Sequence, residues 1–411
     1  MGLPFPWLLA LFVLGFAGEG KRRPDSVVLV NGTKLAGVVV YQDAAELVLR
    51  VGTRDTSYPM KEVSKVDALA ANLAEFIDTW LSSKPDDEEA LRDLANRCER
   101  CELAFEELLL RWKLVLAHPS SEEYHKALGH ELRDGVWGLR DGERWVPLST
   151  WLEPREMKNA WRLESTHFVL ATDGDFALGI DVLLDLECLY RAFFQKFGRE
   201  LHSYEVVERI GVELQSRKRN FSAPTKNAVS WFDPRGNVIY IDGEKGVDRA
   251  RMLMDGTRAL LCNSGSRQRV IDGVIPPWIE AGLSTWVGWN LHGELGRARW
   301  EPAPFTAMYR RVLEHDMREP VKVTRLLNTA PLDYDESELG QEHYAEAFTL
   351  VDFMLGAAGE KYRLRFLDFL RETYRGKGAP PQLYEALDRK GAEIEAEWLA
   401  WIRSGGYARR R

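Results

Sequence analysis

The feature that most constrains the fold of this chain is a pair of short apolar segments, Arg251–Cys262 and Ile275–Trp286. The first segment has the apolar spacing of a helix, in which residues four apart, such as Met254 and Arg258, lie on one face. The second segment begins at two prolines and is predicted to form the next helix. The sequence therefore predicts two consecutive helices in the C-terminal two thirds of the chain.

This pair of segments resembles the gluzincin metallopeptidases, and specifically the bacterial peptidase MA-like group. In that group one helix carries H-E-x-x-H-A-L-L and the next opens with P-x-W-L-x-E-G-L-A. The two histidines and the second-helix glutamate bind zinc, and the glutamate beside the first histidine is the general base. The register is set by Ala259-Leu260-Leu261, by Pro277-Trp278-Ile279 and by Gly282-Leu283.

In this register the zinc-site residues are replaced. Met254 and Arg258 stand at the histidine positions, Asp255 at the general-base position and Ala281 at the third-ligand position, with Glu280 one residue earlier. A thioether is a poor zinc ligand, a guanidinium is a cation, and a methyl group has no donor atom. The resemblance therefore implies a peptidase scaffold without a metal or cofactor. The alternative is that these are plain core residues and the likeness is accidental.

We expect the Arg258 guanidinium to fill the space that the metal would occupy. A desolvated guanidinium needs a carboxylate partner, and Asp255 and Glu280 are the two candidates. In a second interpretation, Arg258 receives the carboxylate of a bound peptide or another ligand.

The resemblance covers residues 156–405 and implies a gluzincin or thermolysin-like domain, mainly helical, with a small antiparallel-edged sheet. Glu342–Leu355 resembles the family's tyrosine-bearing helix, so Tyr344 is the position that would polarise a substrate carbonyl; the alternative is a packed aromatic. Trp278 and Trp286 lie near the site and are candidate binding platforms. Alternatively, these indoles fill the core.

Upstream, the pattern predicts an α+β chain of several parts. Residues 24–68 are rich in short β runs and resemble a small SH3-like or Sm-like barrel. Residues 69–155 are predicted to be a module of helices and one hairpin, with the hairpin turn at Asp141-Gly142. His125 and His130 are five residues apart, on different helix faces, and are expected on the surface rather than as metal ligands.

Residues 1–20 have the apolar run and small residues of a signal peptide. No basic residue precedes this run and Lys21-Arg22-Arg23 follows it, so an uncleaved membrane anchor is the alternative. We therefore expect an exported protein that is periplasmic, secreted or part of the cell envelope. Cys98 and Cys101 lie on a helical pattern. We expect them either to form a local disulfide or to be two buried thiols.

The expected function is a non-catalytic pseudopeptidase that acts as a binding or scaffold protein of the cell envelope through a peptidase-derived cleft. Its ligand is an unidentified protein, peptide or glycan; the net charge of −8 argues against nucleic acid. Contact with a membrane is expected only if the leader stays attached. One alternative is an active hydrolase with an atypical site, which would require zinc or metal-free chemistry. Another is a structural component whose cleft has closed.

Overall fold

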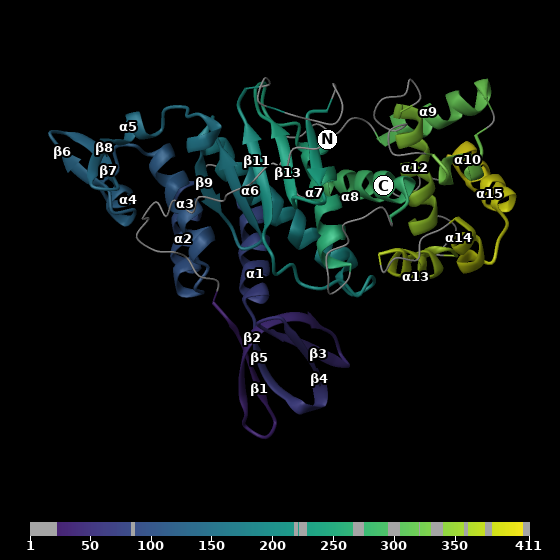
Figure 1. Cartoon of the computed structure of the whole chain (residues 1–411), viewed down its shortest axis with the longest axis horizontal. Helices are drawn as coiled ribbons and strands as arrows, with labels where there is room; N and C mark the ends of the chain where they lie inside the picture. Colours follow the sequence, from purple (N-terminus) through teal and green to yellow (C-terminus); the bar gives the residue numbers. More distant parts are fainter. Residues whose placement is uncertain are drawn as a thin grey trace, which may run out of the picture.

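The computed structural model describes residues 23–83, 87–217, 221, 228–265, 275–294, 305–319, 321–329, 340–356, 361–374 and 380–405. Within them the chain is α+β, with three sheets followed by a helical C-terminal region (Figure 1). The predicted leader lies outside the described residues. None of the helices in the described ranges is long and apolar enough to cross a membrane.

The first part is an antiparallel sheet of five strands, which projects from the rest of the molecule at the bottom of Figure 1. Its small core contains Val27, Val39, Leu47 and Leu49. Val40 and Val48, next to them in sequence, are buried in a separate cluster, as expected for side chains that point to the opposite face of the strands. The strand order is β4-β3-β2-β1-β5. The strands are β1 (Asp25–Leu29), β2 (Lys34–Gln42), β3 (Glu46–Val51), β4 (Arg54–Pro59) and β5 (Val63–Asp67).

Asp25 joins this sheet to the first helix, α1 (Leu69–Ser82). Its buried carboxylate accepts the backbone N–H of Val39 at 2.7 Å and that of Leu69 at 2.7 Å. The residue before the helix is Ala68, whose side chain cannot accept an N–H from the first turn. Asp25 therefore supplies a helix cap from a distant strand.

The second part contains α1 and three further helices, followed by a three-stranded sheet. Residues 88–117 form two helices, because the chain turns after Arg100, where Glu102 takes a positive φ of 58°. Asp87 caps the second helix by accepting the N–H of Ala90. The elements after α1 are α2 (Glu88–Arg100), α3 (Ala104–Ala117), α4 (Glu122–Ala127), β6 (Glu131–Arg133), β7 (Val136–Asp141), β8 (Arg144–Pro147) and α5 (Leu148–Trp151). The predicted hairpin at Asp141-Gly142 is confirmed as β7 and β8.

The prediction that His125 and His130 lie on the surface is wrong. Both side chains are buried, and their Nδ1 atoms are 2.9 Å apart. The helix ends at Ala127, and Gly129, with a φ of 70°, turns the chain back, so spacing on a continuous helix does not apply. His125 stacks on Trp137 of the hairpin, so the pair packs α4 against the three-stranded sheet.

The third part is the central sheet, in the order β12-β13-β11-β10-β9. Its three inner strands are parallel and both edge pairings are antiparallel. Residues 161–172 form two strands, separated by a turn at 165–167. The strands are β9 (Trp161–Glu164), β10 (Phe168–Thr172), β11 (Ile210–Gln215), β12 (Ser230–Asp233) and β13 (Val238–Asp242), and the helix α6 (Phe176–Phe193) connects β10 towards β11.

The remaining helices follow the central sheet and share one continuous core with it and with the helical module. Two of them touch through their backbones, because a Cβ atom on Gly282 would lie 2.5 Å from the carbonyl oxygen of Ala347. The helices are α7 (Arg249–Ser264), α8 (Pro277–Glu294), α9 (Phe305–Arg318), α10 (Val323–Leu327), α12 (Gly340–Gly356), α13 (Arg363–Thr373), α14 (Pro380–Leu387) and α15 (Gly391–Arg403).

Replacing Asp25 by Ala should lower the free energy of unfolding by about 2–4 kcal/mol, because two buried N–H groups lose their acceptor. Asp25→Asn, which keeps one acceptor oxygen, should have an intermediate effect. Urea denaturation of the full chain measures both, with the exposed Asp93→Ala on α2 as control. If Asp25→Ala and Asp93→Ala destabilise equally, Asp25 does not hold the junction.

Candidate functional site

Four of the residues singled out in the sequence come together between α7, α8 and α12. Arg258 lies at the centre. Its Nη1 is 2.9 Å from Oδ1 of Asp255, its Nη2 donates to the hydroxyl of Tyr344 at 3.2 Å, and its Nε is 3.6 Å from Oε1 of Glu280. The expected pairing of Arg258 with these two acids is confirmed. The guanidinium thus contacts groups from three helices.

Local sequence explains why α7 presents these groups. Asp248 caps the helix by accepting the N–H of Arg251 at 3.0 Å. Gly256 lets the helix approach α6, since a Cβ atom there would lie 2.6 Å from a methyl of Leu189. Met254 and Ala281, at two of the three expected ligand positions, are buried apolar residues. They leave Asp255 and Arg258 as the charged groups between residues 254 and 258.

Ser230, on the edge strand β12, is a fifth member that the sequence reasoning missed. Its hydroxyl donates to Oδ2 of Asp255. The strand buries alternate residues, Ser230 and Phe232. That alternation was the available signal, because a polar residue at an inward position of a strand needs a partner.

The electrostatics of the site follow from burial. Burial raises the pKa of Asp255, and Arg258 opposes that shift. For Arg258 burial acts to lower the pKa, but the groups around it outweigh burial and raise the pKa well above its ordinary value. Arg251 lies over the ring of Tyr344, 5.2 Å from its centroid. The site therefore holds two cations beside two carboxylates, Asp255 and Glu280.

The residues present do not fit a zinc site. Zinc binds nitrogen, thiolate and carboxylate ligands in a tetrahedron. Here the aligned positions supply the thioether of Met254, the guanidinium of Arg258 and the methyl of Ala281. Across the part of the chain that the structure describes, no three His, Cys, Asp or Glu side chains are grouped to hold a metal ion.

Trp278 and Trp286 belong to the core and do not face the site as platforms. Trp278 is 1% exposed and stacks with Phe369 of α13. Trp286 is also buried, and its Nε1 donates to Oδ1 of Asp352 at 2.8 Å. Their indole faces are used in packing, which agrees with the alternative that these residues fill the core.

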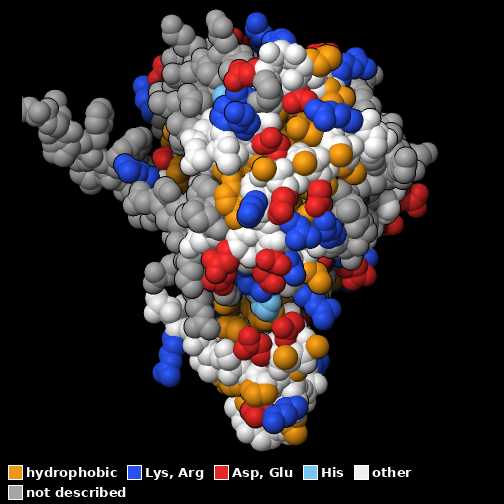
Figure 2. Space-filling model, turned by 90° about the vertical axis from the view of Figure 1, so that its right-hand side faces the viewer, with side chains coloured by type: hydrophobic (Ala, Val, Ile, Leu, Met, Phe, Trp, Pro, Cys, Tyr) orange, Lys and Arg blue, Asp and Glu red, His pale blue; other side chains and the backbone are white. Residues whose placement is uncertain are grey.

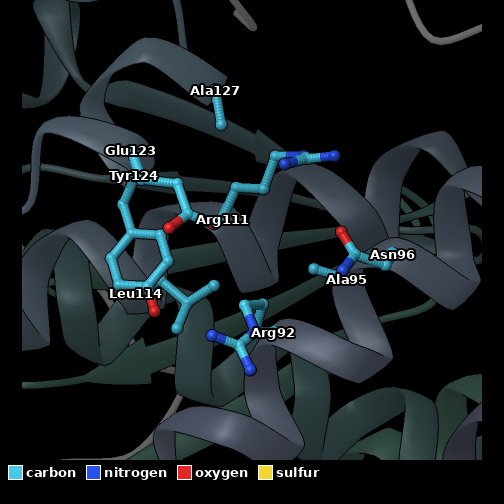
Figure 3. A pocket seen from close by; sticks show the side chains of 8 residues that line it. All are labelled: Arg92, Ala95, Asn96, Arg111, Leu114, Glu123, Tyr124 and Ala127. Atoms are coloured by element: carbon cyan, nitrogen blue, oxygen red, sulfur yellow. The ribbon is translucent and has the colours of Figure 1, made fainter.

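A hollow of about 50 Å³ lies elsewhere, between α2, α3 and α4 (Figure 3). It is small, with room for only a few water molecules. Arg111 on its wall is already paired with Glu107 at 2.6 Å and with Glu99 at 3.0 Å. The hollow is lined by Arg92, Ala95, Asn96, Arg111, Leu114, Glu123, Tyr124 and Ala127. None of these residues was a candidate from the sequence.

The four cysteines are free thiols in the structure, so the disulfide alternative for Cys98 and Cys101 is not the arrangement found. On the face shown in Figure 2, acidic and basic side chains are interspersed among apolar ones.

The chain matches no known family pattern, and no curated protein is similar to it. The likeness to peptidases therefore remains a prediction carried by residues of α7, α8 and α12.

Arg258→Ala should lower the free energy of unfolding by about 2–4 kcal/mol, because it leaves the buried Asp255 without its cation. The double variant Asp255→Asn, Arg258→Met removes both charges and should recover part of that loss. A double-mutant cycle in urea should give a coupling energy of about 1–3 kcal/mol. Strictly additive effects would show that the two side chains do not stabilise each other.

Proposed function

We propose that this chain is an exported, non-catalytic protein on a gluzincin-like peptidase scaffold, which acts in the cell envelope as a binding or scaffold protein. The observation that carries the proposal is the position of Arg258. Its guanidinium stands at the expected second histidine and bonds to Asp255 and Tyr344, beside Glu280. An internal cation takes the place that the family gives to a metal.

The state of Asp255 supports the absence of peptidase chemistry. Peptide hydrolysis by a gluzincin needs a metal-bound water and a carboxylate free to take its proton. Both oxygens of Asp255 are engaged, one by Arg258 and the other by the hydroxyl of Ser230. The carboxylate at the general-base position therefore acts as an anchor for its neighbours.

The same geometry supports ligand binding. The side chain of Glu280 is 37% exposed, and that of Arg258 is 19% exposed. The site thus presents a carboxylate and part of a guanidinium, with the Tyr344 hydroxyl beside them. These groups can hydrogen-bond the backbone, termini or hydroxyls of a protein, peptide or glycan.

A working hydrolase is the second candidate, favoured by one contact. The hydroxyl of Ser230 donates to Asp255, as a nucleophile would to a base. Against it, Arg258 occupies the other oxygen of Asp255 and opposes the rise in pKa that burial causes. Zinc or turnover in the purified protein would favour this candidate.

Purified wild-type protein should contain no stoichiometric zinc and should not cleave casein or peptides. The variant Met254→His, Asp255→Glu, Arg258→His, Ala281→Glu should bind about one zinc ion per chain, because it restores three ligands and the base. Elemental analysis measures the zinc content of each protein, and competition with a chelating dye measures its zinc affinity. The matched control keeps Arg258 and carries the other three changes; it should stay metal-free. A folded four-residue variant without zinc would refute the register.

Ligand binding is tested with arrays of envelope-derived peptides and glycans. Ligands that wild type captures should bind at least about tenfold more weakly to Tyr344→Phe or Glu280→Gln, each of which removes one hydrogen-bonding group. Trp278→Phe, a change in the core, is the control for general damage. Equal binding by all variants would place the ligand elsewhere, and no captured ligand would favour a purely structural role.

A further inference from the structure

A second buried charge cluster lies far along the chain from Arg258 and is centred on His167. This side chain is fully buried in the turn between β9 and β10. Its Nδ1 is 2.8 Å from Oε2 of Glu187, and its Nε2 is 2.9 Å from Oε1 of Glu205. Because carboxylate oxygens accept, both ring nitrogens donate and the ring is an imidazolium. The ring of Tyr190 stacks on it, and the Tyr190 hydroxyl donates to Glu205 at 2.6 Å.

Glu106 of α3 brings a third carboxyl group to this turn. Its Oε1 accepts the backbone N–H of Thr166 at 2.9 Å and the hydroxyl of Thr166 at 2.8 Å. Its Oε2 is buried without a hydrogen-bond partner among the described residues. Glu187, on α6, contributes an unfavourable charge to it and also accepts the N–H of His167 at 2.8 Å.

The cluster lies where three parts of the molecule meet. Glu106 belongs to the helical module, and His167 and Glu187 belong to the central sheet and its helix. The backbone N–H of Glu205 donates to the carbonyl of Val40 on β2 at 2.7 Å, which attaches the N-terminal sheet. The aromatic contact between Tyr41 and His202 extends the same junction.

We propose that this cluster is a proton-controlled joint: protonated Glu106 and His167 hold the helical module, the central sheet and the N-terminal sheet together, and the joint loosens as the pH rises. The inference does not depend on the peptidase-like proposal, because it uses none of the residues around Arg258.

The charge balance explains why protons matter. With all groups ionised, three buried carboxylates would face one imidazolium, and the excess negative charge would be desolvated. No Lys or Arg in the described ranges is within ion-pair distance of Glu106 or Glu187; Arg209 lies over the ring of Phe105 and pairs with Glu164. Another titratable neighbour of Glu106 is the thiol of Cys98, whose pKa burial raises. A proton on Glu106 therefore removes one of the two excess negative charges.

The pKa values give the direction. Burial, followed by the charge of Glu187, raises the pKa of Glu106 from 4.5 to about 7. Its contribution to stability is fully present below its ordinary pKa and is lost as the pH rises through about 7. Burial alone would lower the pKa of His167, but the two carboxylates outweigh it and raise the pKa from 6.5 to about 9. That contribution is present below 6.5 and is lost as the pH rises through about 9.

Hydrogen–deuterium exchange of the full chain tests the joint. Between about pH 5 and about pH 6.5, where Glu106 dominates, the opening constant of the amides in 161–172 and 199–210 should rise about tenfold or more in wild type, after correction for chemical exchange. In Glu106→Gln, which keeps the acceptor for Thr166, the rise should be no more than about threefold. An equal rise in both proteins overturns the proposal.

The matched control is Glu346→Gln on α12, a second buried glutamate whose pKa burial raises to about 7. This variant should keep the wild-type response of the joint. It also decides the matter if Glu106→Gln does not fold. Infrared spectra of Glu346→Gln should then show a protonated carboxylic-acid band at about pH 6 that disappears by about pH 8. The proposal is overturned if that band is absent. It is also overturned if the opening constants of the amides in α15 rise with pH as much as those of the amides in 161–172 and 199–210.

Discussion

The organisation of this molecule depends on the pairing of one buried imidazolium, His167, with carboxylates from separate elements. A cation without access to water must be matched by acids, and these acids come from α6 and from the segment before β11. Each acid must therefore be delivered to the same point by the fold. Hydrophobic burial gives the larger share of the stability, but it is less directional. The charge cluster fixes how the three parts are joined.

The same rule shapes the site around Arg258, where a cation again needs acids from its surroundings. Asp255 and Glu280 supply the negative charges beside Arg258, and Tyr344 accepts a hydrogen bond from it. If the ancestry is that of a zinc peptidase, exchange of a divalent ion for a guanidinium preserved a positive charge between these helices. The surrounding packing could then persist without its chemistry, and this is why we propose a role in binding.

The sequence predicted the helical segments 251–262, 275–286 and 342–355 and the hairpin turn at Asp141-Gly142, because apolar spacing and turn residues are local signals. It also identified Asp255, Arg258, Glu280 and Tyr344 as one group, because the family register aligned them. Ser230 was missed because its partner is 25 positions away, and strand alternation marks an inward position without showing which residue it contacts. His125 and His130 were misplaced because one glycine turn decides whether a helical spacing applies. The junction at His167 involves residues from four elements, and the sequence does not show that they meet.

The contact at Gly282 has a mechanical consequence for whatever occupies the site. Because the backbone of α8 touches the carbonyl of Ala347 and the side chain of Val351 on α12, the two helices cannot slide past each other without a clash. Glu280 and Tyr344, one on each helix, therefore form a stiff wall with fixed separation. Arg258 stands on a third helix and has the longest and most flexible side chain of the three. Any adjustment to molecules of different shape would therefore come from the arginine side chain, while the distance between Glu280 and Tyr344 stays constant.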